Sequence, residues 1–128
     1  MLQKFSIFGL LLSFSLSVVA QDWIKITESD GNRYDGKAGT REFSTNRAGK
    51  QIITAFGRTY AKSDKKYDFV RWYVTVEDCK AGYGKLVTLK MNGDFWFDND
   101  FVENGGTVGS RVAEILCYPV KEEQSKGV

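Results

Sequence analysis

The sequence predicts an α+β protein, a single domain in which an antiparallel β-sheet is followed by one carboxyl-terminal helix. Most of the 128-residue chain consists of short runs rich in β-branched and aromatic residues, separated by turn-forming Gly, Asn and Asp. This pattern is typical of antiparallel strands. Apolar residues at helical spacing follow Gly105 and Gly106. The length suits one domain with a single core.

Residues 1–20 are predicted to be a secretory signal peptide. They begin with Met-Leu-Gln-Lys, continue with an apolar run from Phe5 to Val19, and end with Val18 and Ala20 at the small-residue positions before the cut. The alternative is a membrane anchor, but a spanning helix needs roughly 20 apolar residues, and this run is shorter. We expect a soluble mature chain from Gln21, periplasmic or secreted to the cell surface.

Charge and composition exclude several functions. Removing the signal peptide takes away Lys4 and leaves 17 basic residues, 16 acidic residues and no histidine. The basic residues are interleaved with acidic ones, whereas nucleic-acid binders carry clustered basic footprints. Without histidine, the usual catalytic triads and the commonest general base are missing. We therefore expect no nucleic-acid binding, no enzyme activity and no cofactor.

Acidic residues gather in one segment, at Asp94, Asp98, Asp100 and Glu103. Paired carboxylates can divide acid and base roles in catalysis, and oxygen ligands at short spacing can hold calcium. Their spacing does not fit the twelve-residue calcium loop, and short motifs of this kind often arise by chance. We interpret the segment as a solvated turn without a metal.

The two cysteines, Cys79 and Cys117, are predicted to form a disulfide. Structural zinc requires four sulfur or imidazole ligands, and a cysteine nucleophile usually needs an activating histidine. An even cysteine count in an exported protein favours a disulfide instead. Such a bond raises the free energy of the unfolded chain by roughly 4 kcal/mol, because it restricts its conformations, and it would attach the helix to the sheet.

The predicted strands alternate with polar turns. Residues 40–45 and 51–60 form a hairpin around Arg47-Ala-Gly-Lys50, in which Gly49 takes the positive φ of a tight turn. Residues 62–66 form a further polar turn. The other strands are expected at residues 23–27, 33–35, 67–78 and 85–91, with turns at 30–32, 36–39 and 82–84.

Residues 67–78 show the clearest alternation. The face expected to form the core carries Val70, Trp72, Val74 and Val76. The opposite face is apolar near Tyr67 and polar toward Glu77, so we expect only part of it to be covered. The sequence leaves open whether the core face is covered within one chain or by a second copy.

The carboxyl-terminal helix is expected over residues 107–117. Its predicted core-facing stripe is Val108, Val112 and Ile115, and the opposite side carries Ser110, Arg111 and Glu114. Thr107 or Ser110 is expected to cap the helix, and Pro119 to stop it. Residues 121–128 are predicted to form a disordered polar tail.

Four ordered segments also carry a family resemblance. They are Trp23-Ile-Lys-Ile-Thr-Glu-Ser29, Arg33-Tyr-Asp35, Val76-Glu-Asp-Cys79 and a Gly-Thr-Val-Gly-Ser helix start that leads to Leu116-Cys117. Together they resemble the bacterial surface-adhesin protein E-like domain family, with the domain at residues 21–120.

The resemblance implies a sheet of about six antiparallel strands, bent around the carboxyl-terminal helix and joined to it by the disulfide between Cys79 and Cys117. It also implies a role in the bacterial envelope, where some relatives are displayed as adhesins for host extracellular-matrix proteins. No cysteine lies near the predicted cut to carry a lipid anchor.

The first functional hypothesis is therefore an exported binding module for a protein or glycan. Its candidate site is Phe95, Trp96, Phe97 and Phe101, rimmed by Asp94, Asp98 and Asp100. Consecutive aromatic residues in an extended segment point to both faces, so they cannot all be core, and an exposed aromatic patch marks a binding site. The alternative placement has Phe95 and Phe97 packed inward and Trp96 covering the sheet edge.

The second hypothesis is a small periplasmic inhibitor or stress protein that binds a cell-wall enzyme through a rigid loop at residues 98–104. The basic residues Arg58, Lys62, Lys65 and Lys66 are interpreted as a solvated turn. Open sheet edges would also allow a homodimer.

Overall fold

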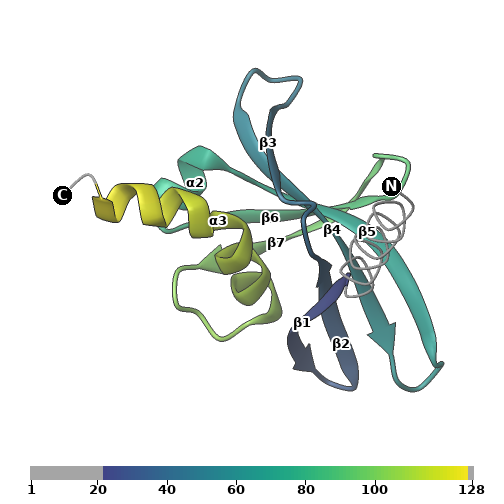
Figure 1. Ribbon diagram of the computed structural model, residues 1–128. Coiled ribbons are helices and arrows are strands. Elements are labelled where there is room, and N and C mark those ends of the chain that lie inside the picture. Colours follow the sequence, from purple (N-terminus) through teal and green to yellow (C-terminus); the bar gives the residue numbers. More distant parts are fainter. Residues whose placement is uncertain (1–21, 127–128) are drawn as a thin grey trace, which may run out of the picture.

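The computed structural model describes residues 22–126, which form one seven-stranded sheet and two helices (Figure 1). The predicted signal peptide and residues 127–128 lie outside this range. The elements are β1 (Trp23–Ser29), β2 (Asn32–Lys37), β3 (Glu42–Thr45), β4 (Gln51–Ala61), β5 (Lys66–Thr75), α2 (Val76–Ala81), β6 (Tyr83–Lys90), β7 (Phe95–Val102) and α3 (Val108–Lys126).

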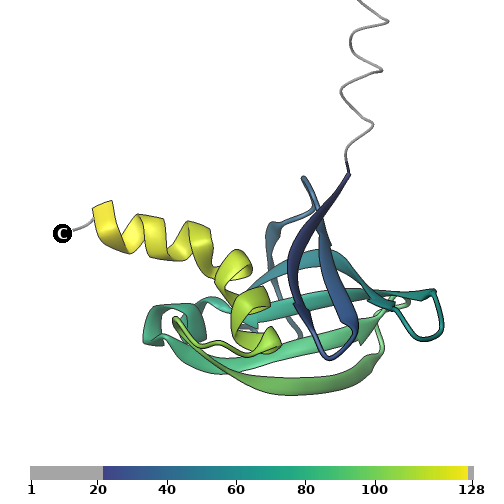
Figure 2. The same ribbon diagram turned by 90° about the horizontal axis from the view of Figure 1, so that it is seen from below.

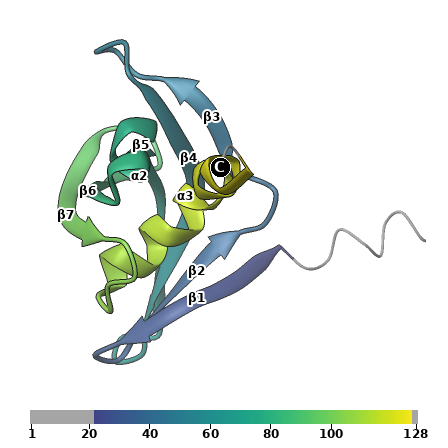
Figure 3. The same cartoon turned by 90° about the vertical axis from the view of Figure 1, so that its left-hand side faces the viewer.

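The sheet has the strand order β1-β2-β4-β5-β6-β7, and β3 pairs with one end of β4. All pairs of neighbouring strands are antiparallel. The sheet bends around α3, which lies on its concave side and packs against both β1 and β7 (Figure 3). The predicted α+β fold, a bent antiparallel sheet with a carboxyl-terminal helix, is confirmed.

The core lies between the concave face of the sheet and α3. Val70, Trp72 and Val74 of β5 alternate into it as predicted, and none is more than 4% exposed. Val112 and Leu116 of α3 belong to the same buried cluster. The core face of β5 is therefore covered by a helix of the same chain.

The predicted strand at residues 67–78 is too long, because β5 ends at Thr75 and the chain turns into α2. Thr75 caps α2, since its Oγ1 accepts a hydrogen bond from the Asp78 amide at 3.0 Å. Two acidic residues in the first turn stabilise the helix start. Gly82 ends the helix with φ of 86°. The alternation over residues 76–78 is too short to distinguish the end of a strand from the start of a helix, and the capping residues Thr75 and Gly82 mark the helix.

The disulfide between Cys79 and Cys117 is confirmed, with their Cα atoms 5.3 Å apart. Cys79 lies on α2 rather than at the end of a strand, so the bond joins two helices. Both cysteines are buried in the core cluster. The bond therefore closes one end of the core between α2 and α3.

Helix α3 continues through Pro119 to Lys126, so the predicted stop and the predicted disordered tail are wrong for the described residues. A proline inside a helix leaves the carbonyl four residues earlier, here that of Ile115, without its usual amide donor. Arg41 supplies a donor instead, with its Nη1 2.9 Å from the Ile115 carbonyl oxygen. Figure 2 shows the last turns of α3 extending beyond the sheet.

The core-facing stripe of α3 is also rotated relative to the prediction. Val112 is buried, but Ile115 is 46% exposed and Ser110 only 6%. Thr107 is the capping residue, because its Oγ1 accepts a hydrogen bond from the Ser110 amide at 3.1 Å. The Ser110 hydroxyl accepts a hydrogen bond from the Val102 amide at 3.1 Å. Ser110 is therefore buried with a partner, where it ties the helix start to β7.

Candidate binding surfaces

The predicted aromatic site at residues 95–97 lies at the start of β7, the edge strand of the sheet. Phe97 pairs with Thr88 and Phe95 with Leu89, so Trp96 is the extra residue of a β-bulge. The bulge places Trp96 beside Phe97 on the concave side and leaves Phe95 on the convex side. All three rings are more than 40% exposed, so the alternative with Phe95 and Phe97 packed inward is wrong.

Trp96 and Phe97 line a cleft of about 500 Å³ between the sheet and the first turn of α3. The rest of its wall is apolar at the level of the core and polar toward the rim. The apolar part includes Val70, Trp72 and Leu86, and the polar part Asp68, Asn99, Asp100 and Thr107. An apolar wall with a few polar groups is typical of a ligand-binding pocket.

Phe101 does not belong to this surface, although the sequence placed it in the candidate site. It is 4% exposed and packs in the core cluster. The physical reason is that the start of α3 covers this end of β7, where Ser110 binds the Val102 amide. The exposed aromatic residues of the candidate site are Phe95, Trp96 and Phe97.

The loop predicted at residues 98–104 is largely strand, because β7 extends to Val102. Two of its acidic residues form separate ion pairs. The Asp100 carboxylate lies 2.7 Å from Lys85 Nζ, and that of Glu103 lies 3.1 Å from Lys121 Nζ. The bond to Asp100 raises the pKa of Lys85. This segment therefore provides no protruding loop of the kind that the inhibitor hypothesis needs.

A second surface, which the sequence did not indicate, covers the convex face over β1, β2, β4 and β5. Two rows of paired residues build it. The first row is Lys25, Asp35, Arg58 and Phe69, and the second is Glu28, Arg33, Tyr60 and Tyr67. A bulge in β1 brings Glu28 into register with Arg33. Together with Trp23, Lys37 and Lys62, these two rows are called the convex cluster.

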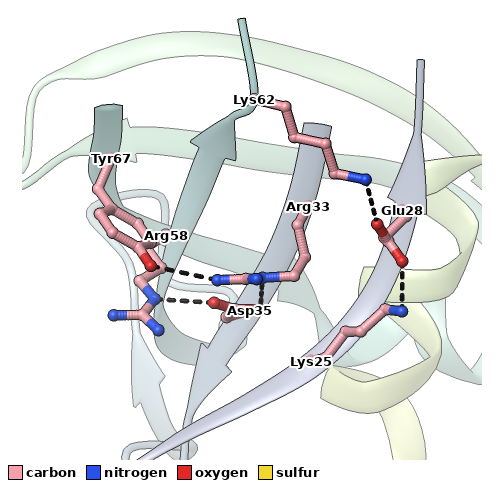
Figure 4. A network of polar contacts seen from close by, with 7 residues as sticks. All are labelled: Lys25, Glu28, Arg33, Asp35, Arg58, Lys62 and Tyr67. Carbon is pink, nitrogen blue, oxygen red and sulfur yellow. Dashed lines mark hydrogen bonds and ion pairs between the residues drawn. The ribbon is translucent and has the colours of Figure 1, made fainter. Parts of the chain in front are cut away.

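Asp35 is the centre of the convex cluster and is only 3% exposed. Its two carboxylate oxygens accept hydrogen bonds from Arg58 Nε at 2.8 Å and from Arg33 Nε at 3.2 Å. Arg33 Nη2 also donates to the Tyr67 hydroxyl at 3.2 Å (Figure 4). Attraction to Asp35 raises the pKa of Arg33. The two arginines thus compensate for the burial of the carboxylate.

Aromatic rings enclose the Arg58 guanidinium. Its Cζ lies 4.4 Å from the ring centroid of Trp23 and 4.4 Å from that of Tyr67. Lys37 Nζ lies 5.8 Å from the Trp23 centroid, and the Phe69 ring also packs 5.8 Å from Trp23. These distances are within the range of cation–π attraction and aromatic packing.

Glu28 forms the outer part of the convex cluster. Its carboxylate accepts hydrogen bonds from Lys25 Nζ and, at 2.8 Å, from Lys62 Nζ (Figure 4). The hydrogen bonds from Lys25 and Lys62 lower the pKa of Glu28 to about 2. Lys62 and Arg58, interpreted from sequence as parts of a solvated turn, therefore each hold a carboxylate.

Models of protein families, curated proteins and solved structures were compared with the chain, and none of the three comparisons gave a match. Within residues 22–126, no helix has the length and apolar character that a membrane crossing requires.

Proposed function

We propose that this protein is an exported binding module of the bacterial cell envelope that holds a protein partner at the Trp96–Phe97 cleft. The observation that carries the proposal is the β-bulge, which presents two neighbouring aromatic side chains to one cleft. Large aromatic side chains at the centre of a contact supply much of the binding free energy of protein interfaces. The envelope location and a host-matrix partner rest on the family resemblance.

The cleft is tested by replacing Trp96. Binding of the purified protein to a panel of immobilised extracellular-matrix proteins is measured for the wild type, Trp96→Ala and Tyr83→Ala. Tyr83 is 67% exposed and lies outside the cleft lining, so it is a matched control. We expect Trp96→Ala to weaken binding by more than about tenfold, since a central aromatic anchor contributes about 2 kcal/mol. Equal binding by all three proteins would remove the cleft from the proposal.

The location is tested separately. An epitope tag is inserted after Ser63, in the exposed turn between β4 and β5, which leaves the Lys62–Glu28 contact in place. Intact cells are then treated with protease. Loss of the tag would support display on the surface. Protection until the outer membrane is lysed would contradict adhesion and favour the periplasmic alternative.

A further inference from the structure

We propose that the convex cluster is a second binding site and that its ligand is a polysaccharide with carboxylate groups. The cluster lies on the face of the sheet opposite the Trp96–Phe97 cleft. The proposal for the convex cluster therefore does not depend on the function proposed for that cleft.

Arg58 is the centre of this site. Its Nε is held by the buried Asp35 (Figure 4), and its two terminal nitrogens make no hydrogen bond to a described residue. The rings of Trp23 and Tyr67 fix the plane of the guanidinium. A guanidinium held in this way can donate two parallel hydrogen bonds to a carboxylate. Because folding has already ordered the side chain, binding loses little further conformational freedom.

The charge of the convex cluster complements a polyanion. Its cations are Lys25, Arg33, Lys37, Arg58 and Lys62, and its carboxylates are Glu28 and Asp35. The cluster thus has a net charge of three positive units and leaves 13 basic and 14 acidic residues in the rest of the chain. Four of the cations lie on the adjacent strands β1, β2 and β4, which are spaced about 4.8 Å apart, and Lys62 directly follows β4. Such a row suits acidic groups that repeat along a polymer.

The rings favour a sugar polymer over an acidic peptide. Tyr67 is 41% exposed and Phe69 48% exposed, so both offer ring surface beside the cations. Aromatic side chains combine an apolar face with tolerance of a wet, polar surrounding. This combination matches a sugar ring, which has apolar C–H faces and polar edges.

Binding is measured with three polymers at low salt. Polygalacturonate carries one carboxylate on each sugar, its methyl ester has the same backbone without charge, and polyglutamate has the charge without sugar rings. We expect polygalacturonate to bind the tightest. Its affinity should fall steeply as the salt concentration is raised, because binding releases counterions from the polymer and added salt opposes this release. Equal binding of the methyl ester would overturn the charge requirement, and equal binding of polyglutamate would overturn the role of the rings.

Lys37→Gln is the main variant, because Lys37 contacts the Trp23 ring of the cluster and does not hold Asp35. Arg111→Gln removes the same charge from the exposed side of α3 and is the control. We expect Lys37→Gln to bind polygalacturonate about fivefold more weakly than Arg111→Gln, in the range of one charge-assisted contact. Arg58→Lys keeps the charge but loses the paired donors. It should bind still more weakly, with its folding checked by thermal unfolding.

Three further outcomes would overturn the proposal. Lys37→Gln and Arg58→Lys could both bind as tightly as the control. Trp96→Ala could abolish polygalacturonate binding, which would place the polymer in the cleft. A thymidine oligonucleotide could bind more tightly than polygalacturonate, which would make the convex cluster a nucleic-acid site.

Discussion

Gly57 of β4 makes room for the ring of Trp72 in the core. A Cβ at this position would lie 2.1 Å from Trp72 Cζ3, far inside van der Waals contact. We expect Gly57→Ala to lower the free energy of unfolding by about 1–3 kcal/mol, measured by urea denaturation, because the ring must move in a packed core. Gly106→Ala is the control, since an added Cβ there has no atom within 4 Å. Equal losses in both variants would rule out the ring contact as the cause.

The ion pairs of Glu28 predict a pH dependence of stability. The pKa of Glu28 is lowered from 4.5 to about 2 in the folded protein, so the ionised carboxylate stabilises the fold above about pH 4.5. This stabilisation is lost as the pH falls toward 2. We therefore expect Glu28→Gln to be less stable than the wild type at pH 6, with the difference vanishing near pH 2.

Urea unfolding at several pH values checks this expectation. The Glu28 side chain is 38% exposed, so the stability difference between the two proteins should be small. It should shrink further at about 0.5 M salt, because salt at this concentration screens exposed charges. A stability difference that is the same at pH 2 and pH 6 would mean that the charge of Glu28 is not its cause.

The sequence predicted which residues are buried where the alternation of a single strand determined their burial. The alternation of Val70, Trp72 and Val74 was sufficient to predict their burial. It failed for Phe101, whose surroundings depend on where α3 crosses β7, and for Ile115. The face of α3 that packs on the core carries Leu116 together with small residues. Apolar spacing alone did not distinguish this face from the one that carries Ile115.

Among the elements, α3 shows how a distant contact can override a local stop signal. Pro119 removes the donor for the Ile115 carbonyl, and Arg41, 74 residues earlier in the chain, provides one. Arg41 also lies 6.0 Å from the Tyr118 ring centroid. The sequence therefore predicted a helix end at Pro119 that does not occur, because the compensating donor comes from Arg41 in the connection between β2 and β3.

This arrangement predicts coupling between Arg41 and Pro119. Pro119→Ala restores the amide donor, so the Ile115 carbonyl no longer depends on Arg41. We expect Arg41→Gln to cost about 1 kcal/mol in the wild type and less in the Pro119→Ala background. A double-mutant cycle by urea unfolding measures the difference. Additive effects of the two substitutions would contradict the compensation.

For the whole molecule, the sequence predicted the antiparallel sheet, the helix and the disulfide, but not the convex cluster. The first three depend on local periods and on a cysteine count. The convex cluster depends on the pairing of β2 with β4 and of β4 with β5. This pairing brings Asp35 to Arg58, 23 positions further along the chain, and Arg33 to Tyr67, 34 positions further along. The sequence does place Arg33 and Asp35 on one face of a strand, and Arg58 and Tyr60 on one face of another. Only the register of β2 against β4 shows that these two pairs lie beside each other.

The disulfide acts on the whole molecule, because it closes a separation of 38 residues that includes all of β6 and β7. Loop entropy predicts that replacing Cys79 and Cys117 together by Ala lowers the free energy of unfolding by about 4 kcal/mol. If the bond acts by restricting the unfolded chain, the variant should also unfold with a steeper urea dependence, since its unfolded state exposes more surface. Reductant should shift the wild type toward the variant and leave the variant unchanged. A loss of stability with an unchanged urea dependence would instead assign the effect to the packing of α2 against α3 in the folded state.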